Sequence, residues 1–173
     1  FENTYELPVI ITHTMNVYGE RQHPEKFIPN TLWKLQRGEK ILIHSDSTKT
    51  KPGSRHYIYA EDVARAVMFI VENKDKLMNK KEDIYGAKCL KVNIPGAKEL
   101  NNLEIAELIS KYSGLELNFE LVDFHSSRPG HDLRYALDGT LIKSLGWNHK
   151  YSIEDSFEKL IHWFLDNPEW LDF

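Results

Sequence analysis

The chain has 173 residues, which is the size of one ordinary domain. Hydrophobic residues make up 41% of it and charged residues 28%, a composition typical of globular proteins and not of disordered ones. The formal net charge of −4 leaves no basic excess for a nucleic-acid backbone, so we expect no nucleic-acid partner. No apolar run is long enough to span a bilayer, and we expect no membrane partner.

The chain contains one cysteine and does not begin with methionine. The single cysteine, Cys89, excludes an internal disulfide framework and a zinc site built from several cysteines. Such sparse use of cysteine is typical of the reducing cytoplasm, where we expect this protein to reside. Because the chain begins at Phe1, we expect it to be a piece of a longer protein.

The first third of the chain predicts a strand, a helix, a strand and a loop. Residues 8–12 form an apolar, β-branched run, which is typical of a strand buried on both faces in a parallel sheet. The spacing of apolar residues from Ile28 to Leu35 predicts a helix. Residues 41–44 predict a short strand, and residues 45–54 predict an exposed polar loop.

A second helix and strand follow in the middle of the chain. Glu61 and Asp62 begin the predicted helix, because negative side chains favour the positive end of the helix dipole. Residues 90–94 predict a strand. The apolar face of the helix is expected to consist of Val63, Val67, Ile70 and Val71.

The last part of the chain predicts two capped helices around a strand. The pair Asn101-Asn102 caps the first helix and Gly114 ends it. Residues 117–121 alternate between apolar and polar, which predicts a half-buried strand. Ser152 and Asp155 form a capping box at the start of the last helix. Strands and helices alternate throughout, so the predicted fold class is α/β.

Several well-known chemical motifs are absent from the sequence. It contains no Gly-x-Gly-x-x-Gly or Gly-x-x-x-x-Gly-Lys phosphate loop and no Gly-x-Ser-x-Gly elbow. The eight histidines stand at unrelated spacings, so we expect no metal site.

Four polar clusters remain as candidates, each with an ordinary structural alternative. Asn16 follows the first predicted strand, where α/β sheets bind ligands, and is equally typical of a turn. Lys26 precedes a helix start, which favours anions, although such a segment is more often a solvated loop. Arg55 could clamp a phosphate or stack on the surface. Arg128 and His131 flank a Pro-Gly turn that could bind an oxyanion or be an ordinary tight turn.

In this order, the clusters and their neighbours resemble the C-terminal half of a known enzyme group. The similarity is to the dTDP-glucose 4,6-dehydratases, within the extended short-chain dehydrogenase/reductase family, and it covers nearly the whole chain. The segments that carry it are Asn16-Val17-Tyr18-Gly19, Pro24-Glu25-Lys26-Phe27-Ile28-Pro29, Glu61-Asp62-Val63-Ala64-Arg65-Ala66 and Arg128-Pro129-Gly130-His131-Asp132.

The resemblance implies the substrate-binding part of a Rossmann-like α/β fold whose N-terminal NAD-binding half is missing from this chain. It implies a single C-terminal region over residues 1–173. Within this region, residues 1–20 are the last part of the Rossmann-side sheet and residues 21–173 bind the substrate. The family's catalytic Tyr-x-x-x-Lys and its glycine-rich NAD loop precede this region. We therefore expect NAD as the cofactor of the intact protein, and no catalytic residue or turnover in this chain alone.

The resemblance also assigns residues to a nucleotide-sugar site. Asn16 matches a residue that contacts the diphosphate and sugar, and Lys26 and Phe27 match residues of the same pocket. Arg55 and Arg128 match arginines that bind the diphosphate. The remaining matches are Leu42, Ile43 and His44 on a strand beside the nucleobase, Asn102 at a helix start, and His131 in the turn that contains Arg128.

The intact protein is therefore expected to be an NAD-dependent nucleotide-sugar 4,6-dehydratase. One alternative is a part of a UDP-sugar epimerase or decarboxylase. Another is a stand-alone, non-catalytic module that binds sugar nucleotides. The family dimerises largely through helices of its N-terminal half, so we expect a homodimer of the intact protein and no native-like dimer of this chain.

Overall fold

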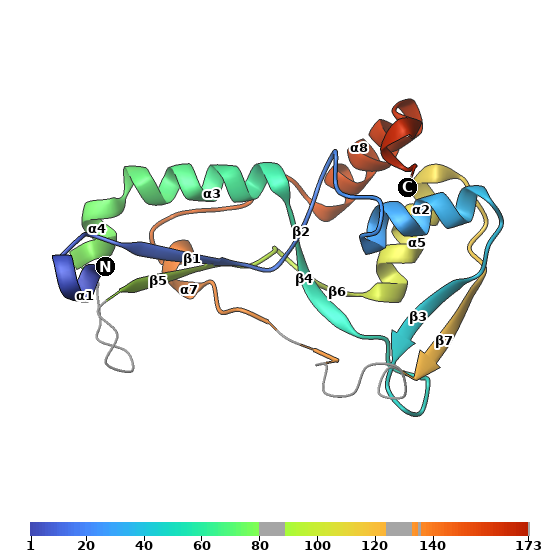
Figure 1. Cartoon of the computed structure of the whole chain (residues 1–173), viewed down its shortest axis with the longest axis horizontal. Coiled ribbons are helices and arrows are strands. Elements are labelled where there is room, and N and C mark those ends of the chain that lie inside the picture. Colours follow the sequence, from blue (N-terminus) through green and yellow to red (C-terminus); the bar gives the residue numbers. More distant parts are fainter. Residues whose placement is uncertain (80–88, 124–132, 135, 173) are drawn as a thin grey trace.

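The computed structural model describes residues 1–79, 89–123, 133–134 and 136–172. The molecule is elongated, and two packed groups of elements lie at opposite ends of a short central sheet (Figure 1). The helices are α1 (Glu2–Tyr5), α2 (Phe27–Gln36), α3 (Ala60–Glu72), α4 (Lys74–Asn79), α5 (Asn102–Ser113), α7 (Thr140–Ser144), α8 (Ile153–Asp166) and the 3-10 helix η1 (Pro168–Trp170). The strands are β1 (Ile10–Thr14), β2 (Asn16–Tyr18), β3 (Ile41–Ser45), β4 (Ser54–Tyr59), β5 (Leu90–Ile94), β6 (Glu99–Asn101) and β7 (Phe119–Asp123).

The described strands form three small sheets. β1 pairs in parallel with β5 at one end of the molecule, and β3 pairs in parallel with β7 at the other. The central sheet has the order β2-β4-β6, in which β2 runs parallel to β4 and β6 runs antiparallel to it. These elements confirm the predicted α/β class.

Local sequence signals explain where the helices begin and end. Asn101 accepts hydrogen bonds from the backbone N–H groups of Leu103 and Glu104, and the Glu104 carboxylate accepts one from the Asn101 N–H in return. Gly114 then ends α5 in the left-handed conformation, with φ at 70°. Ser152 caps α8 through the N–H of Asp155. The predicted starts of both helices and the predicted end of α5 are confirmed, but at α8 only the bond to Ser152 forms and not the reciprocal bond of a full capping box.

Two separate hydrophobic cores form, one at each end. The larger core lies between α2, α5 and α8. Side chains of β3 and the buried tyrosines Tyr18, Tyr57 and Tyr59 also pack in it. The smaller core packs α3 and α7 against the β1–β5 sheet. Fully buried side chains of the larger core include Leu32, Ile43, Ile105, Ile109, Phe157, Leu160 and Phe164, and those of the smaller core include Ile58, Ala66, Val92, Ile94 and Ile142.

Two apolar segments are more exposed than is typical of their sequence patterns. The strand expected over residues 8–12 begins at Ile10, and its residues from Ile11 to Thr14 are exposed and not buried on both faces. Among the described residues β1 pairs only with β5, so its other edge has no neighbour. On α3, the expected apolar face is buried at Ile70 but exposed at Val67 and Val71.

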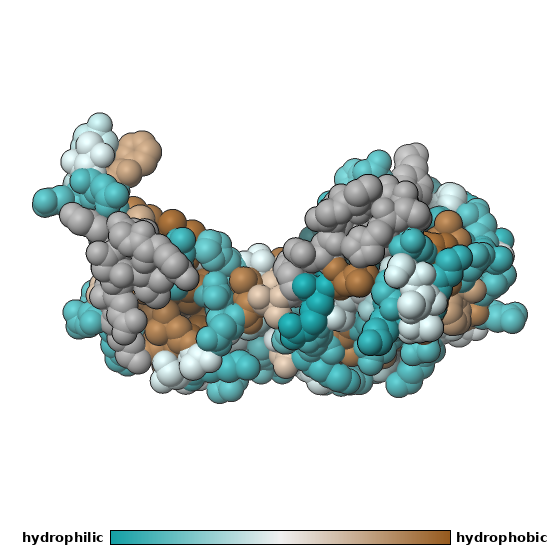
Figure 2. Space-filling model, turned by 90° about the horizontal axis from the view of Figure 1, so that it is seen from below, coloured by the Kyte–Doolittle hydropathy of each residue, from teal (hydrophilic) through white to brown (hydrophobic). Residues whose placement is uncertain are grey.

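Many exposed apolar side chains therefore lie at the end of the molecule that contains β1, β5 and α3. Figure 2 shows hydrophobic surface gathered at the end formed by β1 and β5. Parallel sheets are normally covered on both faces, because their strands are apolar on both sides. The exposed apolar residues of this end are Phe1, Tyr5, Leu7, Ile11, Val67, Met68 and Val71.

We expect this surface to bind a hydrophobic dye and to promote self-association. Replacing Val67 and Val71 together by glutamine should reduce dye fluorescence and light scattering, since both side chains are exposed. The free energy of unfolding should change by no more than about 0.5 kcal/mol, as for most surface substitutions. Leu165→Gln, an exposed position on α8, is the control and should change neither signal. Unchanged dye binding in the double variant would contradict the prediction.

Candidate functional site

A pocket of about 320 Å³ lies where β2, β4 and the start of α2 meet. This volume is in the range of small-molecule sites. The pocket brings together three residues predicted from the sequence, Asn16, Lys26 and Phe27. Its other lining residues are Val17, Tyr18, Gln22, Ile28 and Tyr57.

The segment between β2 and α2 folds back over the end of β2 and closes the pocket. The Gln22 side chain donates to the Val17 carbonyl at 3.0 Å. The Lys26 N–H donates to the His23 carbonyl at 2.9 Å, and Lys26 is the extended residue that precedes α2. Lys26 therefore lines the pocket at the positive end of the α2 dipole, a position that favours an anionic ligand.

Two tyrosines form the wall of the pocket on the side of the larger core. The Tyr18 hydroxyl shares a hydrogen bond of 2.6 Å with Ser156, and burial raises the pKa of Tyr18, so the side chain stays neutral. The Tyr57 hydroxyl donates to Oδ1 of Asn102 at 2.8 Å. This bond connects Asn102, a predicted site residue, to the pocket wall.

Sequence reasoning did not identify Tyr57 as a lining residue. The available signal was the alternation of Arg55, Tyr57 and Tyr59, which places all three side chains on one face of a strand. Side chains on one face of a strand are two residues, or roughly 7 Å, apart. Arg55 is therefore the neighbour of Tyr57 along this face of β4.

Arg55 is half-buried, and its guanidinium is held by backbone carbonyls. Nη1 donates to the Ser54 carbonyl at 2.6 Å and to the Leu133 carbonyl at 2.7 Å. The alternative of a loosely stacked surface arginine does not describe this geometry. Its role toward a diphosphate stays a prediction.

The predicted residues of β3 divide between its two faces. Ile43 is completely buried in the larger core, so only its backbone could reach a ligand. Leu42 is 54% exposed on the other face, which His44 shares by alternation. The His44 carbonyl accepts from the Gly53 N–H at 3.0 Å, and the Gly53 carbonyl accepts from the Asn102 N–H at 2.9 Å. Gly53 thus connects β3 to the start of α5.

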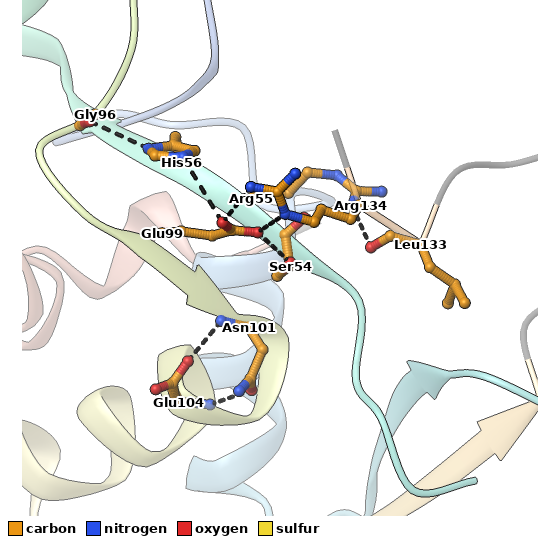
Figure 3. A network of polar contacts seen from close by, with 9 residues as sticks. All are labelled: Ser54, Arg55, His56, Gly96, Glu99, Asn101, Glu104, Leu133 and Arg134. Carbon is orange, nitrogen blue, oxygen red and sulfur yellow. Dashed lines mark hydrogen bonds and ion pairs between the residues drawn. The ribbon is translucent and has the colours of Figure 1, made fainter. Parts of the chain in front are cut away.

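Arg128 and His131 lie outside the described residues. The structure describes Leu133 and Arg134, which come directly after residues 124–132. These two residues are bound along the start of β4 (Figure 3). The Ser54 N–H donates to the Leu133 carbonyl at 2.9 Å, and Arg134 forms a two-pronged ion pair with Glu99, both bonds at 2.8 Å.

Glu99 is a further polar residue that sequence reasoning missed. Besides Arg134 it accepts a 2.5 Å hydrogen bond from the Ser54 hydroxyl, and it faces His56 at 3.8 Å. Hydrogen bonds from Arg134 and then Ser54 hold the pKa of the Glu99 carboxyl below its ordinary value of 4.5. Each partner is at least 35 residues away in the chain, so no local pattern reveals the cluster.

Metal-binding clusters and membrane-spanning helices are absent from the described residues. Those residues contain no group of three or more His, Cys, Asp or Glu side chains able to bind a metal ion. No helix among them is long and apolar enough to cross a membrane.

The Glu99 cluster should make stability depend on pH. Because the folded-state pKa is lowered, its stabilising contribution is present above pH 4.5 and is lost as the pH falls through the folded-state value. Chemical denaturation at pH 7 should show Glu99→Gln to be less stable than the wild type, and the difference should shrink at pH 3. Glu158→Gln, on the exposed side of α8, serves as the control. An equal difference at both pH values would contradict this account.

Comparison with known proteins identifies relatives over nearly the whole chain. Residues 1–85 match the model of the NAD dependent epimerase/dehydratase family. The low-salt glycan biosynthesis protein Agl12 of Haloferax volcanii is 34% identical over 170 residues, which cover 98% of this chain and 49% of Agl12. A dTDP-glucose 4,6-dehydratase of Escherichia coli is 34% identical over 181 residues, which cover 98% of this chain and 45% of the enzyme.

A solved structure agrees with these relatives. DesIV, a dTDP-glucose 4,6-dehydratase from Streptomyces venezuelae determined with NAD and TYD bound, matches with a TM-score of 0.77 at 28% identity. The match covers 99% of this chain and 48% of DesIV. The chain is therefore similar to NAD-dependent epimerases and dehydratases over nearly its whole length, and it spans about half the length of the relatives that it matches.

Proposed function

We propose that this chain is the C-terminal, nucleotide-sugar-binding part of an NAD-dependent nucleotide-sugar 4,6-dehydratase. The observation that carries the proposal is the pocket, in which Asn16, Lys26 and Phe27 meet although they come from two different elements. Similarity to dTDP-glucose 4,6-dehydratases over 98% of the chain supports the same substrate class.

The chemistry of the pocket fits a sugar nucleotide. Lys26 and the amino end of α2 favour the negative charge of a diphosphate. Asn16 offers an amide that can donate to and accept from sugar hydroxyls. Phe27 and Tyr57 supply aromatic surface, and the exposed side of β3 with Leu42 and His44 is assigned to the nucleobase.

The described residues do not fit the NAD cofactor of the family. A dinucleotide normally binds where a parallel strand turns through glycines into a helix. Here β1 leads directly into β2, and β5 leads into β6. We therefore assign NAD binding to the part of the relatives' length that this chain does not span, and we expect no turnover from this chain alone.

The exposed apolar surface of β1 and α3 supports the proposal that this chain is the C-terminal half of the protein. Among the described strands β1 pairs only with β5, and a parallel strand edge beside exposed apolar side chains is normally covered by another layer. We propose that the missing NAD-binding half provides it. The cytoplasmic location and the homodimer of the intact protein stay predictions.

Nucleotide-sugar binding can be tested by calorimetric titration of the chain. We expect Arg55→Gln to lose roughly 1.5–3 kcal/mol of binding free energy for dTDP-glucose, the scale of hydrogen bonds to charged groups. Glutamine removes the positive charge while keeping a polar side chain with N–H donors.

Lys51→Gln, in the exposed loop before β4, is the matched control for loss of a positive charge and should bind normally. Unchanged affinity in Arg55→Gln, or an equal loss in Lys51→Gln, would contradict the assignment. Titration with UDP-glucose in parallel distinguishes the alternative of a UDP-sugar enzyme, for which UDP-glucose would bind more tightly.

A further inference from the structure

Glu99 gathers its partners on the face of the central sheet opposite to the pocket. β4 and β6 pair so that His56 lies opposite Glu99 and Ser54 lies opposite Asn101. Directly opposed residues of an antiparallel pair share a face, and neighbours along a strand alternate. Glu99, Ser54 and His56 are therefore on one face, and Arg55 is on the other, together with Tyr57 of the pocket wall.

The Glu99 carboxylate fixes the path of the backbone at Leu133 and Arg134. Both of its oxygens accept hydrogen bonds from the Arg134 guanidinium at 2.8 Å, and one of them also accepts from the Ser54 hydroxyl. A two-pronged, charge-assisted contact restrains direction as well as distance. The Ser54–Arg134 bridge keeps the same segment parallel to the start of β4.

The Leu133 carbonyl transfers this restraint to the pocket face. It accepts hydrogen bonds from the Ser54 N–H at 2.9 Å and from Nη1 of Arg55 at 2.7 Å. Because Nη1 also donates to the Ser54 carbonyl, two fixed oxygens set the orientation of the guanidinium (Figure 3). A shift of Leu133 would release one of the two.

We propose that Glu99 is a positioning residue for Arg55: through Arg134 it holds the Leu133 carbonyl that orients the Arg55 guanidinium toward the diphosphate of a nucleotide. The inference rests on the proposed function, which makes Arg55 a diphosphate ligand. Glu99 itself lies on the opposite face of the sheet and does not touch the ligand. By restraining the Arg55 side chain in advance, Glu99 reduces the conformational entropy that this side chain loses when the nucleotide binds.

The test compares a ligand that has the diphosphate with one that lacks it. We measure the affinities of dTDP and thymidine, and of UDP and uridine, for the whole chain. Glu99→Gln should lower the ratio of diphosphate to nucleoside affinity about fivefold, and Arg134→Gln should do the same. The double variant should be no worse than either single variant, because both act through one contact.

Glu61→Gln is the matched control. Glu61 also accepts from a cation and a hydroxyl, Lys150 at 3.0 Å and Tyr151 at 2.7 Å, but it is located on α3. Glu61→Gln should leave the ratio of diphosphate to nucleoside affinity unchanged, even if it lowers the free energy of unfolding. A second readout needs no ligand: the NMR signals of the Arg55 guanidinium should show restricted rotation in the wild type and faster rotation in Glu99→Gln.

The outcomes separate the positioning role from the proposed function. If the wild type prefers diphosphates and Glu99→Gln keeps the same preference, or weakens diphosphate and nucleoside equally, the positioning role is overturned and the proposed function stands. If the wild type binds neither kind of ligand, the proposed function is overturned and this inference with it. A lowered ratio in Glu99→Gln but not in Glu61→Gln supports the proposal.

Discussion

The structure depends most on β4, because this one strand contributes to both cores and to the pocket. Strand residues alternate between faces, so Tyr57 and Tyr59 enter the larger core while Ile58 enters the smaller one. Its two edges are also used differently, since β2 pairs with residues 57–59 and β6 with residues 54–56. A shift of one residue in the register of β4 would turn the tyrosines away from the pocket and break both cores together.

A second polar cluster holds α8 against this strand. The Tyr59 hydroxyl donates to Glu20 at 2.6 Å and accepts from Lys159 at 2.9 Å. Burial and then the bond to Glu20 raise the pKa of Tyr59 to about 12, so it remains a hydroxyl donor at neutral pH. Ser156, one turn earlier on α8, holds Tyr18 in the pocket wall. The wall is thus fixed by contacts that do not involve a ligand, which reduces the ordering cost of binding.

The parts of the fold that could be predicted are those whose causes are local. The helices α5 and α8 follow from a cap and a 3.6-residue apolar stripe, and β5 matches the predicted residues 90–94. By contrast, β4 carries polar residues at Ser54, Arg55 and His56, and it exists because partners distant in sequence pair with both of its edges. The same limit applies to the site. The motif around Lys26 and Phe27 is contiguous and could be identified, whereas Tyr57 and Glu99 gain their places only through the tertiary fold.

The separation of the two cores keeps the pocket apart from the exposed apolar surface of the molecule. Exposed apolar residues such as Ile11 and Val71 lie on β1 and α3, the elements of the smaller core, at the end of the molecule formed by β1 and β5 (Figure 1). The edge of β1 that pairs with no other described strand lies at the same end. The side chains of Tyr18, Tyr57 and Phe27 belong to or pack against the larger core, whose helices cover one another. The pocket wall therefore packs with α5 and α8, in a different core from the one beside the exposed residues of β1, and β4 is the strand that contributes side chains to both cores.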